Sequence, residues 1–236
     1  MDKNPTIVIT GATRGIGKAT AIELIKESTH TVIGLGRDSE ALSQIQQMSD
    51  RINKNFIPYR IDLSKLNEIH NFSKYISHRK EKIDVLINNA GAMHNEPFLR
   101  TSAASFDKIM NINLRSPFFL IQSMALLMNS GSHIVNITSM GGVQWSSKFP
   151  GLSAYSASKG ALTILTEVLA EELKDYSISV NGLAFGAVAT EMLLTAFPGY
   201  KAPIEKEEMA QFVSYFALHG QQFFNGKVLP VSSSTP

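Results

Sequence analysis

The sequence predicts an α/β protein in which a doubly wound, seven-stranded parallel sheet carries helices on both faces. Two observations predict this fold class. Short runs rich in β-branched residues alternate with longer segments of helical periodicity, as in βαβ units. The short runs are also apolar almost throughout, which is typical of strands that helices cover on both faces. No linker, repeat or low-complexity stretch divides the sequence, so we expect residues 1–236 to form one domain.

The expected elements follow from these patterns in chain order. The strands are TIVIT at 6–10, TVIGL at 31–35, FIPYRI at 56–61, IDVLIN at 83–88, HIVNIT at 133–138, SISVNGL at 177–183 and KVLPV at 227–231. Helical periodicity between them predicts helices at 15–28, 39–50, 65–78, 103–129, 153–175 and 205–219, with a frayed tail at 232–236. Right-handed crossovers would place a ligand site beyond the carboxyl ends of the strands.

Composition excludes several classes of protein. The chain has no cysteine, which excludes disulfide frameworks, thiolate catalysis and cysteine-bound zinc, and its six histidines lack metal-ligand spacing. The formal net charge is +2 with both signs spread along the chain, so we expect no nucleic-acid partner. The N-terminus does not resemble a signal peptide, and no apolar run reaches the ~18–20 residues of a membrane span. We therefore expect a soluble, cytoplasmic protein with no metal and no membrane partner.

A glycine-rich segment, TGATRGIG at residues 10–17, joins the first predicted strand to the first predicted helix. Glycine lets the backbone turn tightly and approach a pyrophosphate, and the helix N-terminus adds free N–H groups. A simple strand-to-helix turn is the alternative, but the position in the first βα junction favours a Rossmann-type dinucleotide site. The residues expected to contact the nucleotide here are Gly11, Thr13, Arg14, Gly15, Ile16 and Gly17.

The end of the second strand indicates which dinucleotide binds. An acidic residue at this position accepts hydrogen bonds from the ribose of NAD, whereas arginine suits the 2′-phosphate of NADP. Here Gly36 stands at the likely acidic position, and Arg37 follows it. Arg14 could reach the same phosphate from the glycine-rich segment. Asp38 is the opposing signal, but it stands two positions late and suits the cap of the next helix, so we expect NADP(H).

Motifs in the same order and register resemble the short-chain dehydrogenase/reductase family in its single-domain form. Asp62 and Leu63 follow the third strand, where that family has residues facing the adenine. Asn89, Ala90 and Gly91 follow the fourth strand, where the family's second signature borders the cofactor. The resemblance extends from Thr10 to about Val231 and is greatest to the 3-oxoacyl-carrier-protein reductase branch.

Four further residues resemble the catalytic set of that family: Asn113, Ser139, Tyr155 and Lys159. Tyr155 and Lys159 stand four apart in a predicted helix, so both project from one face. A phenol has an unperturbed pKa of about 10, and we expect the Lys159 ammonium to lower the pKa of Tyr155. Tyr155 would then protonate a carbonyl oxygen, to which Ser139 donates a hydrogen bond. A surface tyrosine, a strand-end serine and a capping asparagine are the structural alternatives.

The resemblance implies further contacts with the cofactor. Lys159 would also hold the nicotinamide ribose, and Asn113 would hold a water that links Lys159 to solvent. Val188 would contact the nicotinamide carboxamide through its backbone, and Thr190 through its side chain. Phe185 replaces the proline usual in this segment, which affects the rigidity expected of the loop.

The loop between Ser139 and Tyr155 is longer than is usual in the family, and the segment after Thr190 is shorter than the usual substrate lid. An open, aromatic-lined pocket is therefore expected, with the alternative that its apolar residues only pack the loops together. The predicted lining residues are Trp145, Phe149, Met192, Leu193 and Phe197. Such a pocket would suit a long or tethered substrate, such as a β-ketoacyl group on a carrier protein.

These features predict an NADPH-dependent reductase of a small-molecule or carrier-protein-tethered ketone. An NADP-dependent dehydrogenase of a secondary alcohol, sugar or steroid is one alternative, and a nucleotide-binding scaffold or sensor without turnover is another. The complete catalytic set argues against the scaffold. Relatives usually associate through the helices that match 103–129 and 153–175, which implies a homodimer or homotetramer. Residues 231–234 replace an Asp-Gly-Gly turn that joins subunits in many relatives.

Overall fold

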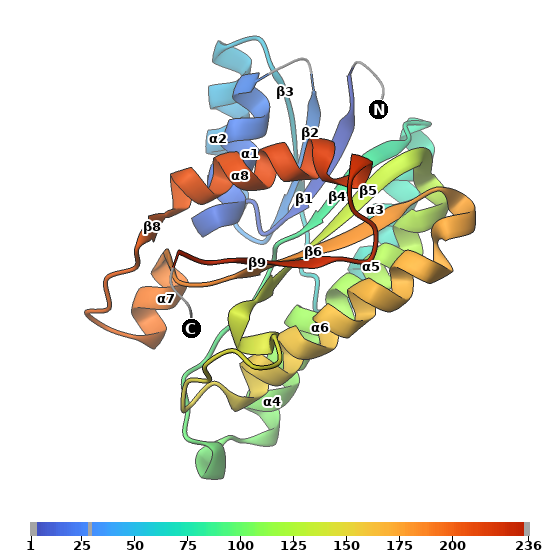
Figure 1. Cartoon of the computed structure of the whole chain (residues 1–236). Helices are drawn as coiled ribbons and strands as arrows, with labels where there is room; N and C mark the ends of the chain where they lie inside the picture. The colour runs from blue at the N-terminus through green and yellow to red at the C-terminus, as the bar shows by residue number, and fades with distance from the viewer. Residues whose placement is uncertain (1–3, 28–29, 234–236) are drawn as a thin grey trace.

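A computed structural model describes residues 4–27 and 30–233 and confirms the predicted parallel sheet (Figure 1). Seven strands lie in the order β3-β2-β1-β4-β5-β6-β9, and every neighbouring pair is parallel. They are β1 (Thr6–Thr10), β2 (Thr31–Gly36), β3 (Asn55–Arg60), β4 (Ile83–Asn88), β5 (Met128–Ser139), β6 (Ser179–Phe185) and β9 (Val228–Val231). The strand order reverses between β1 and β4, which places the topological switch point, and hence the expected ligand site, at their carboxyl ends.

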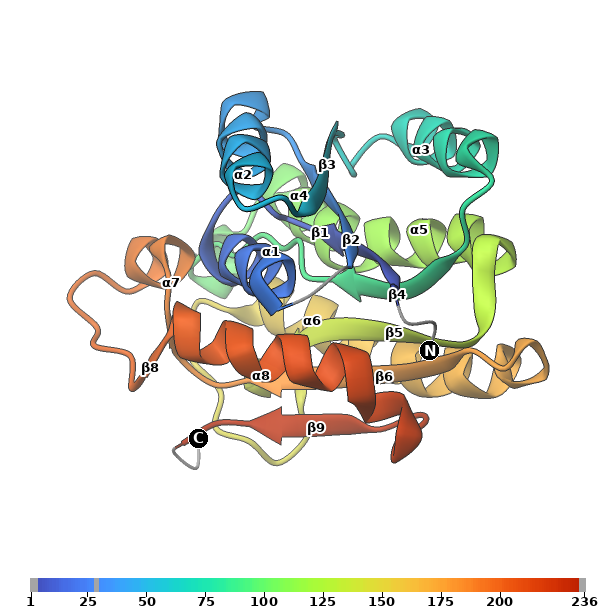
Figure 2. The same ribbon diagram turned by 90° about the horizontal axis from the view of Figure 1, so that it is seen from above.

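Helices cover both faces of this sheet, as predicted, and alternation along β1 separates the two faces. Ile7 and Ile9 pack against α1 (Gly15–Glu27), α2 (Ser39–Arg51) and α8 (Lys206–His219), and α1 and α8 lie side by side (Figures 1 and 2). Val8 faces the opposite layer. That layer contains α3 (Leu66–Arg79), α4 (Ala103–Met110), α5 (Ser116–Met124) and α6 (Ser153–Glu172). Each face therefore has its own buried core, which holds the sheet rigid behind the site.

The single helix expected at 103–129 is wrong in two respects. A π-helical turn, Asn111–Arg115, separates α4 from α5, and a 3-10 turn ends at Leu127, so Met128 already belongs to β5. Pro117 has no N–H to donate to the carbonyl of Asn113, and the N–H of Ser116 instead reaches back to the carbonyl of Asn111. The widened turn directs Asn113 into the protein interior, where it is buried.

Two short strands and one short α-helix were not predicted. They are the strands β7 (Val188–Ala189) and β8 (Ile204–Glu205), which pair with each other, and the helix α7 (Glu191–Ala196). The strand predicted at 177–183 also starts later than expected, because Ser177 adopts a left-handed conformation (φ 54°) and β6 starts only at Ser179. Residue 28 of the first predicted helix and residues 234–236 of the predicted tail lie outside the described residues.

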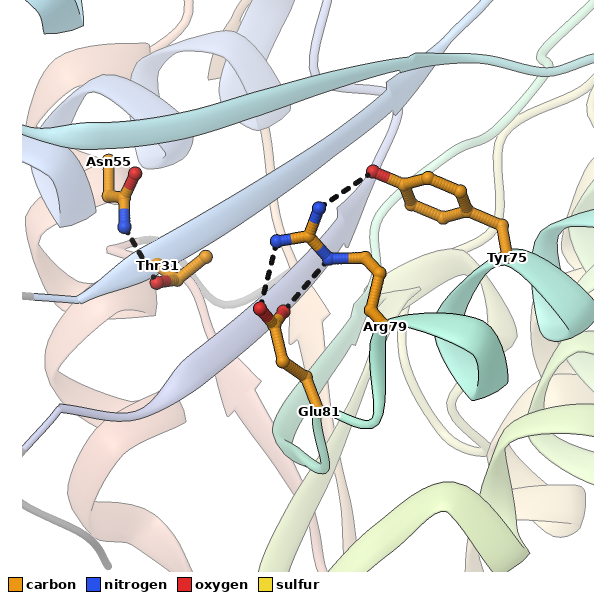
Figure 3. Close-up of polar contacts among 5 residues, drawn as sticks. All are labelled: Thr31, Asn55, Tyr75, Arg79 and Glu81. Atoms are coloured by element: carbon orange, nitrogen blue, oxygen red, sulfur yellow. Dashed lines mark hydrogen bonds and ion pairs between the residues drawn. The ribbon is translucent and has the colours of Figure 1, made fainter.

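The amino ends of the strands carry polar contacts of a purely structural kind. Figure 3 shows Asn55 donating to the hydroxyl of Thr31 at 3.1 Å, across the first residues of β3 and β2. Arg79, at the end of α3, donates to both carboxylate oxygens of Glu81 (3.0 and 2.8 Å) and to the hydroxyl of Tyr75 (3.2 Å). Partly exposed ion pairs of this kind stabilise a fold only slightly. This edge lies away from the carboxyl ends of the strands.

Within residues 4–27 and 30–233, none of the helices combines the length and apolar character that crossing a membrane requires. The same part of the chain holds no group of three or more histidine, aspartate or glutamate side chains that could ligate a metal ion.

Candidate active site

The loops after β1 and β4 are tied together at the switch point. The hydroxyl of Thr10 accepts hydrogen bonds from the backbone N–H groups of Asn89 (3.0 Å) and Ala90 (2.9 Å). The side-chain amide of Asn89 donates in return to the carbonyl of Thr10 at 2.9 Å. Two of the predicted nucleotide-binding segments, 11–17 and 89–91, therefore form one rigid wall.

The glycine-rich segment leaves room for a ligand because side chains are excluded from it. Gly11 and Gly15 adopt φ values of 71° and 54°, a left-handed conformation that favours glycine. A β-carbon on Gly17 would lie 2.3 Å from the carbonyl oxygen of Gly11 and 2.2 Å from the Asn89 amide nitrogen, so only glycine fits. α1 begins at Gly15 and has no acidic residue in its first turn. Free N–H groups, a positive helix end and a backbone without side chains fit a pyrophosphate.

Thr190 lies beside this cradle, although it is distant in sequence. A β-carbon on Gly15 would be 3.7 Å from the Thr190 methyl group and 3.8 Å from a carboxylate oxygen of Glu191. The hydroxyl of Thr190 accepts from the N–H of Leu193 at 3.3 Å and so caps the N-terminus of α7. Val188, also expected near the nicotinamide, stands two residues before Thr190 and is buried.

The residues expected around the adenosine gather at the ends of β2 and β3. Asp62 accepts from the backbone and hydroxyl of Ser64 (3.1 and 2.8 Å). Burial alone would raise the pKa of Asp62, but the Ser64 hydrogen bonds and the nearby Arg37 charge outweigh it and lower that pKa. A β-carbon on Gly36 would lie 2.4 Å from the Thr13 methyl group, so a side chain at this position would have to displace Thr13. Leu63 is buried, and its carbonyl accepts from Ser116.

The four expected catalytic residues lie together at the carboxyl ends of β4 and β5. Ser139 ends β5 and hydrogen-bonds with the phenol of Tyr155. Lys159 is 4% exposed; its ammonium nitrogen donates to the carbonyl of Ile137 at 2.7 Å and lies 6.0 Å from the centre of the Tyr155 ring. A β-carbon on Gly91 would lie 3.5 Å from the side-chain oxygen of Asn113 and 3.7 Å from the Lys159 nitrogen. Gly91 thus borders both residues.

Asn113 ties three segments together through its side chain. Its oxygen accepts from the N–H of Ala92 at 2.7 Å, and its nitrogen donates to the Ala92 carbonyl and the Ser158 hydroxyl, both at 2.9 Å. Both amide hydrogens are therefore used within the protein. A water held by Asn113 would bind its backbone carbonyl, which Pro117 leaves without an α-helical donor.

Ser158 was missed in the sequence, although it stands between Tyr155 and Lys159. Its hydroxyl accepts from Asn113 and donates to the carbonyl of Tyr155 at 2.7 Å, and its side chain is fully buried. A small polar residue on the buried face of an otherwise amphipathic helix was the available signal. Ser158 links Asn113 to the turn of α6 that carries the phenol.

The prediction that Lys159 lowers the pKa of Tyr155 is wrong in this structure. Burial raises the pKa of the Tyr155 phenol, while the hydrogen bond with Ser139 lowers it by less. Burial also lowers the pKa of Lys159 to about 8. The same removal from water disfavours both charged groups, and the ammonium is directed at the Ile137 carbonyl rather than at the phenol oxygen. Ser139 is thus the group that favours the ionised phenol.

The expected substrate-pocket residues divide into two sets. Phe149 and Phe197 contact each other edge to face, with ring centres 6.1 Å apart, and Met192 and Leu193 are half-buried on α7. Trp145 is 93% exposed and adopts φ 68°, so it belongs to neither a packed wall nor a packed loop in this structure. Its part in substrate binding stays a prediction.

Comparison with known proteins gives consistent likenesses. The sequence profile of the short chain dehydrogenases matches residues 5–200. A 3-oxoacyl-(acyl-carrier-protein) reductase of Synechocystis sp. is 30% identical over 187 residues, covering 78% of this chain and 74% of that protein. A 2-dehydro-3-deoxy-D-gluconate 5-dehydrogenase of Escherichia coli is 31% identical, covering 78% and 71%. The solved structure of a 4-hydroxyisoleucine dehydrogenase complexed with NADH has a TM-score of 0.86 at 27% identity, covering 98% of both chains.

Proposed function

We propose, because this chain belongs to the short-chain dehydrogenase/reductase family and is therefore an oxidoreductase, that it reduces a ketone to a secondary alcohol with NADPH. The observation that carries the proposal is the meeting of Tyr155, Ser139 and Lys159 at the carboxyl end of β5, beside the glycine cradle. A nicotinamide bound along that edge would supply the hydride. The chain's own residues would supply the proton and the binding of the carbonyl oxygen.

Tyr155 is the proton donor in this proposal. Because burial keeps its pKa above the usual value, the phenol is protonated at neutral pH and ready to donate in the reductive direction. Ser139, already hydrogen-bonded to that phenol, would donate to the same carbonyl oxygen. Lys159, with a pKa of about 8, is charged in most molecules at neutral pH and can return a proton. The backbone carbonyl of Asn113, which lacks its α-helical donor because of Pro117, offers a place for the water that would link Lys159 to solvent.

Contacts around β2 support NADP(H) as the cofactor. Gly36 has no carboxylate to read the ribose of NAD, and Thr13 occupies the space that a side chain at position 36 would need. The exposed guanidinium groups of Arg37 and Arg14 are free to pair with a 2′-phosphate. Loss of one charged hydrogen bond weakens binding about tenfold or more, so Arg37→Ala should raise the Kd for NADPH and leave that for NADH unchanged. Arg51→Ala, in the last turn of α2, is the control; equal effects on both cofactors would contradict the assignment.

The proposed substrate is a β-ketoacyl thioester, free or on a carrier protein. Similarity to a 3-oxoacyl-(acyl-carrier-protein) reductase supports it. Similarity to a dehydrogenase of a sugar acid supports the alternative, a small secondary alcohol or sugar oxidised with NADP. An assay of NADPH oxidation with acetoacetyl and longer β-ketoacyl thioesters, set beside small free ketones and sugar acids, separates the two.

We also propose that two copies of the chain associate through α4, α5 and α6. A groove of about 440 Å³ lies between α4 and the side of α6 opposite Tyr155, lined by Phe98, Phe106 and Ala157 among others. Further along the same helices Phe118, Ile164 and Val168 are exposed. Apolar side chains exposed along one face are typical of an interface. Ile164→Glu with Val168→Glu should give a monomer in sedimentation experiments, and an unchanged mass would contradict this interface.

Substitution of Tyr155 by phenylalanine tests the proposed chemistry directly. Removal of a general acid costs about 10²–10⁴-fold in turnover, while the ring and the cofactor cradle remain. Tyr155→Phe should therefore lose most NADPH oxidation and keep its Kd for NADPH. Tyr176→Phe, in an exposed turn after α6, is the matched control and should keep full activity. Retained turnover in Tyr155→Phe, or activity lost together with NADPH binding, would refute the proposed role.

A further inference from the structure

The helix α7 rests beside the active site with few contacts to hold it. It has six residues, and none of its side chains is buried. A helix this short has little stability of its own. At its start, Thr190 caps it and β7 pairs with β8; an exposed ion pair joins Glu191 to Lys206 at 3.7 Å. The start of α7 is thus attached to the body, and Figure 1 shows its other end extending beside the carboxyl edge of the sheet.

A side chain from another loop holds the far end of α7. Asn95, in the loop after β4, donates from its side-chain nitrogen to the carbonyl of Ala196, the last residue of the helix, at 2.9 Å. Carbonyls in the last turn of a helix have no donor within the helix. Asn95 therefore supplies a hydrogen bond that α7 cannot make by itself.

The same amide also meets the loop that leads to Tyr155. Its oxygen occupies the space beside Gly151, where a β-carbon would lie only 1.9 Å away, and Gly151 adopts φ 86°. The next residue, Glu96, donates its N–H to the Gly151 carbonyl at 2.9 Å. The Phe149 and Phe197 rings touch beside this point. Three loops, one from β4, one leading into α6 and one following α7, therefore converge on Asn95.

We propose that Asn95 is a clasp that closes α7 over the substrate entrance and thereby sets how well small substrates are retained. α7 carries Met192 and Leu193, and its capping residue Thr190 lies against the glycine cradle, so the position of its tip determines the width of the opening above Tyr155. With the clasp closed, a small ketone is enclosed between α7 and the loop at 149–151. A tethered acyl chain needs the clasp to open. The effect on substrates rests on the proposed function, whereas the clasp itself does not.

Asn95→Asp tests the clasp with almost no change of shape. The aspartate keeps the size of the side chain but loses the N–H that binds Ala196, and Asn95 is exposed, so the core is untouched. Hydrogen exchange should become about fivefold faster at the amides of Phe197 and Leu194, because one net hydrogen bond is lost. The KM for small ketones should rise by a similar factor while kcat holds or increases. Gly151→Ala, which displaces the Asn95 amide, should reproduce both changes.

His94→Ala is the matched control, because it alters the neighbouring exposed residue, whose ring contacts Ser105 rather than α7. It should leave the exchange of α7 and the KM unchanged. Unchanged exchange at Phe197 in both Asn95→Asp and Gly151→Ala would overturn the clasp, whatever the activity. So would faster exchange spread over the whole chain, or a fall in kcat at constant KM. Faster exchange confined to α7, in a protein that reduces no carbonyl compound, would uphold the clasp and reject the proposed function instead.

Discussion

His133 should make the stability of this protein depend steeply on pH below 6.5. The side chain is fully buried in β5, where Nδ1 lies 3.0 Å from the carbonyl of Ala217 and Nε2 lies 3.0 Å from the side-chain nitrogen of Asn181. These partners fix a neutral ring that donates from Nδ1 and accepts at Nε2. A second proton would place an N–H against the N–H of Asn181. Burial accordingly lowers the pKa of His133 from 6.5 to about 4.

The sign and size of the effect follow from that difference. Between pH 6.5 and about 4 the unfolded chain binds a proton that the folded chain refuses, so the free energy of unfolding falls as pH falls. Each pKa unit corresponds to about 1.4 kcal/mol, so this contribution is fully present above pH 6.5, and about 3 kcal/mol of it is lost near pH 4. That is a large part of the ~5–15 kcal/mol that stabilises most domains.

Urea unfolding at several pH values measures this contribution directly. His133→Gln keeps one donor and one acceptor but does not titrate, so its unfolding free energy should decline less between pH 7 and 4, by about 3 kcal/mol. Carboxyl groups such as Asp62 begin to titrate near the acid end of this range in the unfolded chain, and the difference between the parent and variant curves removes their contribution. His70→Gln, an exposed position, should follow the parent curve. Parallel curves for His133→Gln and the parent would refute the reasoning.

Three further changes have defined outcomes. Ser158→Ala leaves a buried N–H of Asn113 without its acceptor, which costs about 1–3 kcal/mol of favourable free energy at this position. We expect kcat to fall at least about tenfold in steady-state assays, while the Kd for NADPH stays unchanged. Gly17→Ala drives a methyl group to 2.3 Å from the Gly11 carbonyl and should abolish NADPH binding in a fluorescence titration. Because the pKa of Lys159 is about 8, its charge is lost as pH rises through that value, and kcat/KM for ketone reduction should fall above it; a profile flat to pH 10 would contradict this role.

The parallel sheet was predictable because each strand can be recognised from its own residues. Runs such as Ile7 to Ile9 are apolar on both faces, and only a strand between two helical layers buries such a run. The break in the long helix at Asn113 was harder to foresee. Pro117 predicts only that one helical hydrogen bond is missing, and a kink, a new helix or a π turn can each accommodate that loss. The buried partners of Asn113, Ala92 and Ser158, decide among these, and they lie 21 and 45 positions away.

The same distinction separates the parts of the site that could be predicted from those that could not. Tyr155 and Lys159 share a helical face, so their proximity follows from a spacing of four residues. Asn95 and Ala196 are 101 positions apart; Asn95 lies in a loop, and Ala196 ends a helix too short for its periodicity to indicate a direction. Their contact exists because the carboxyl ends of parallel strands bring all the connecting loops to one edge. The proximity of residues on one helix can therefore be inferred from the sequence. Contacts between loops, such as the hydrogen bond that we propose controls access to the active site, required the structure.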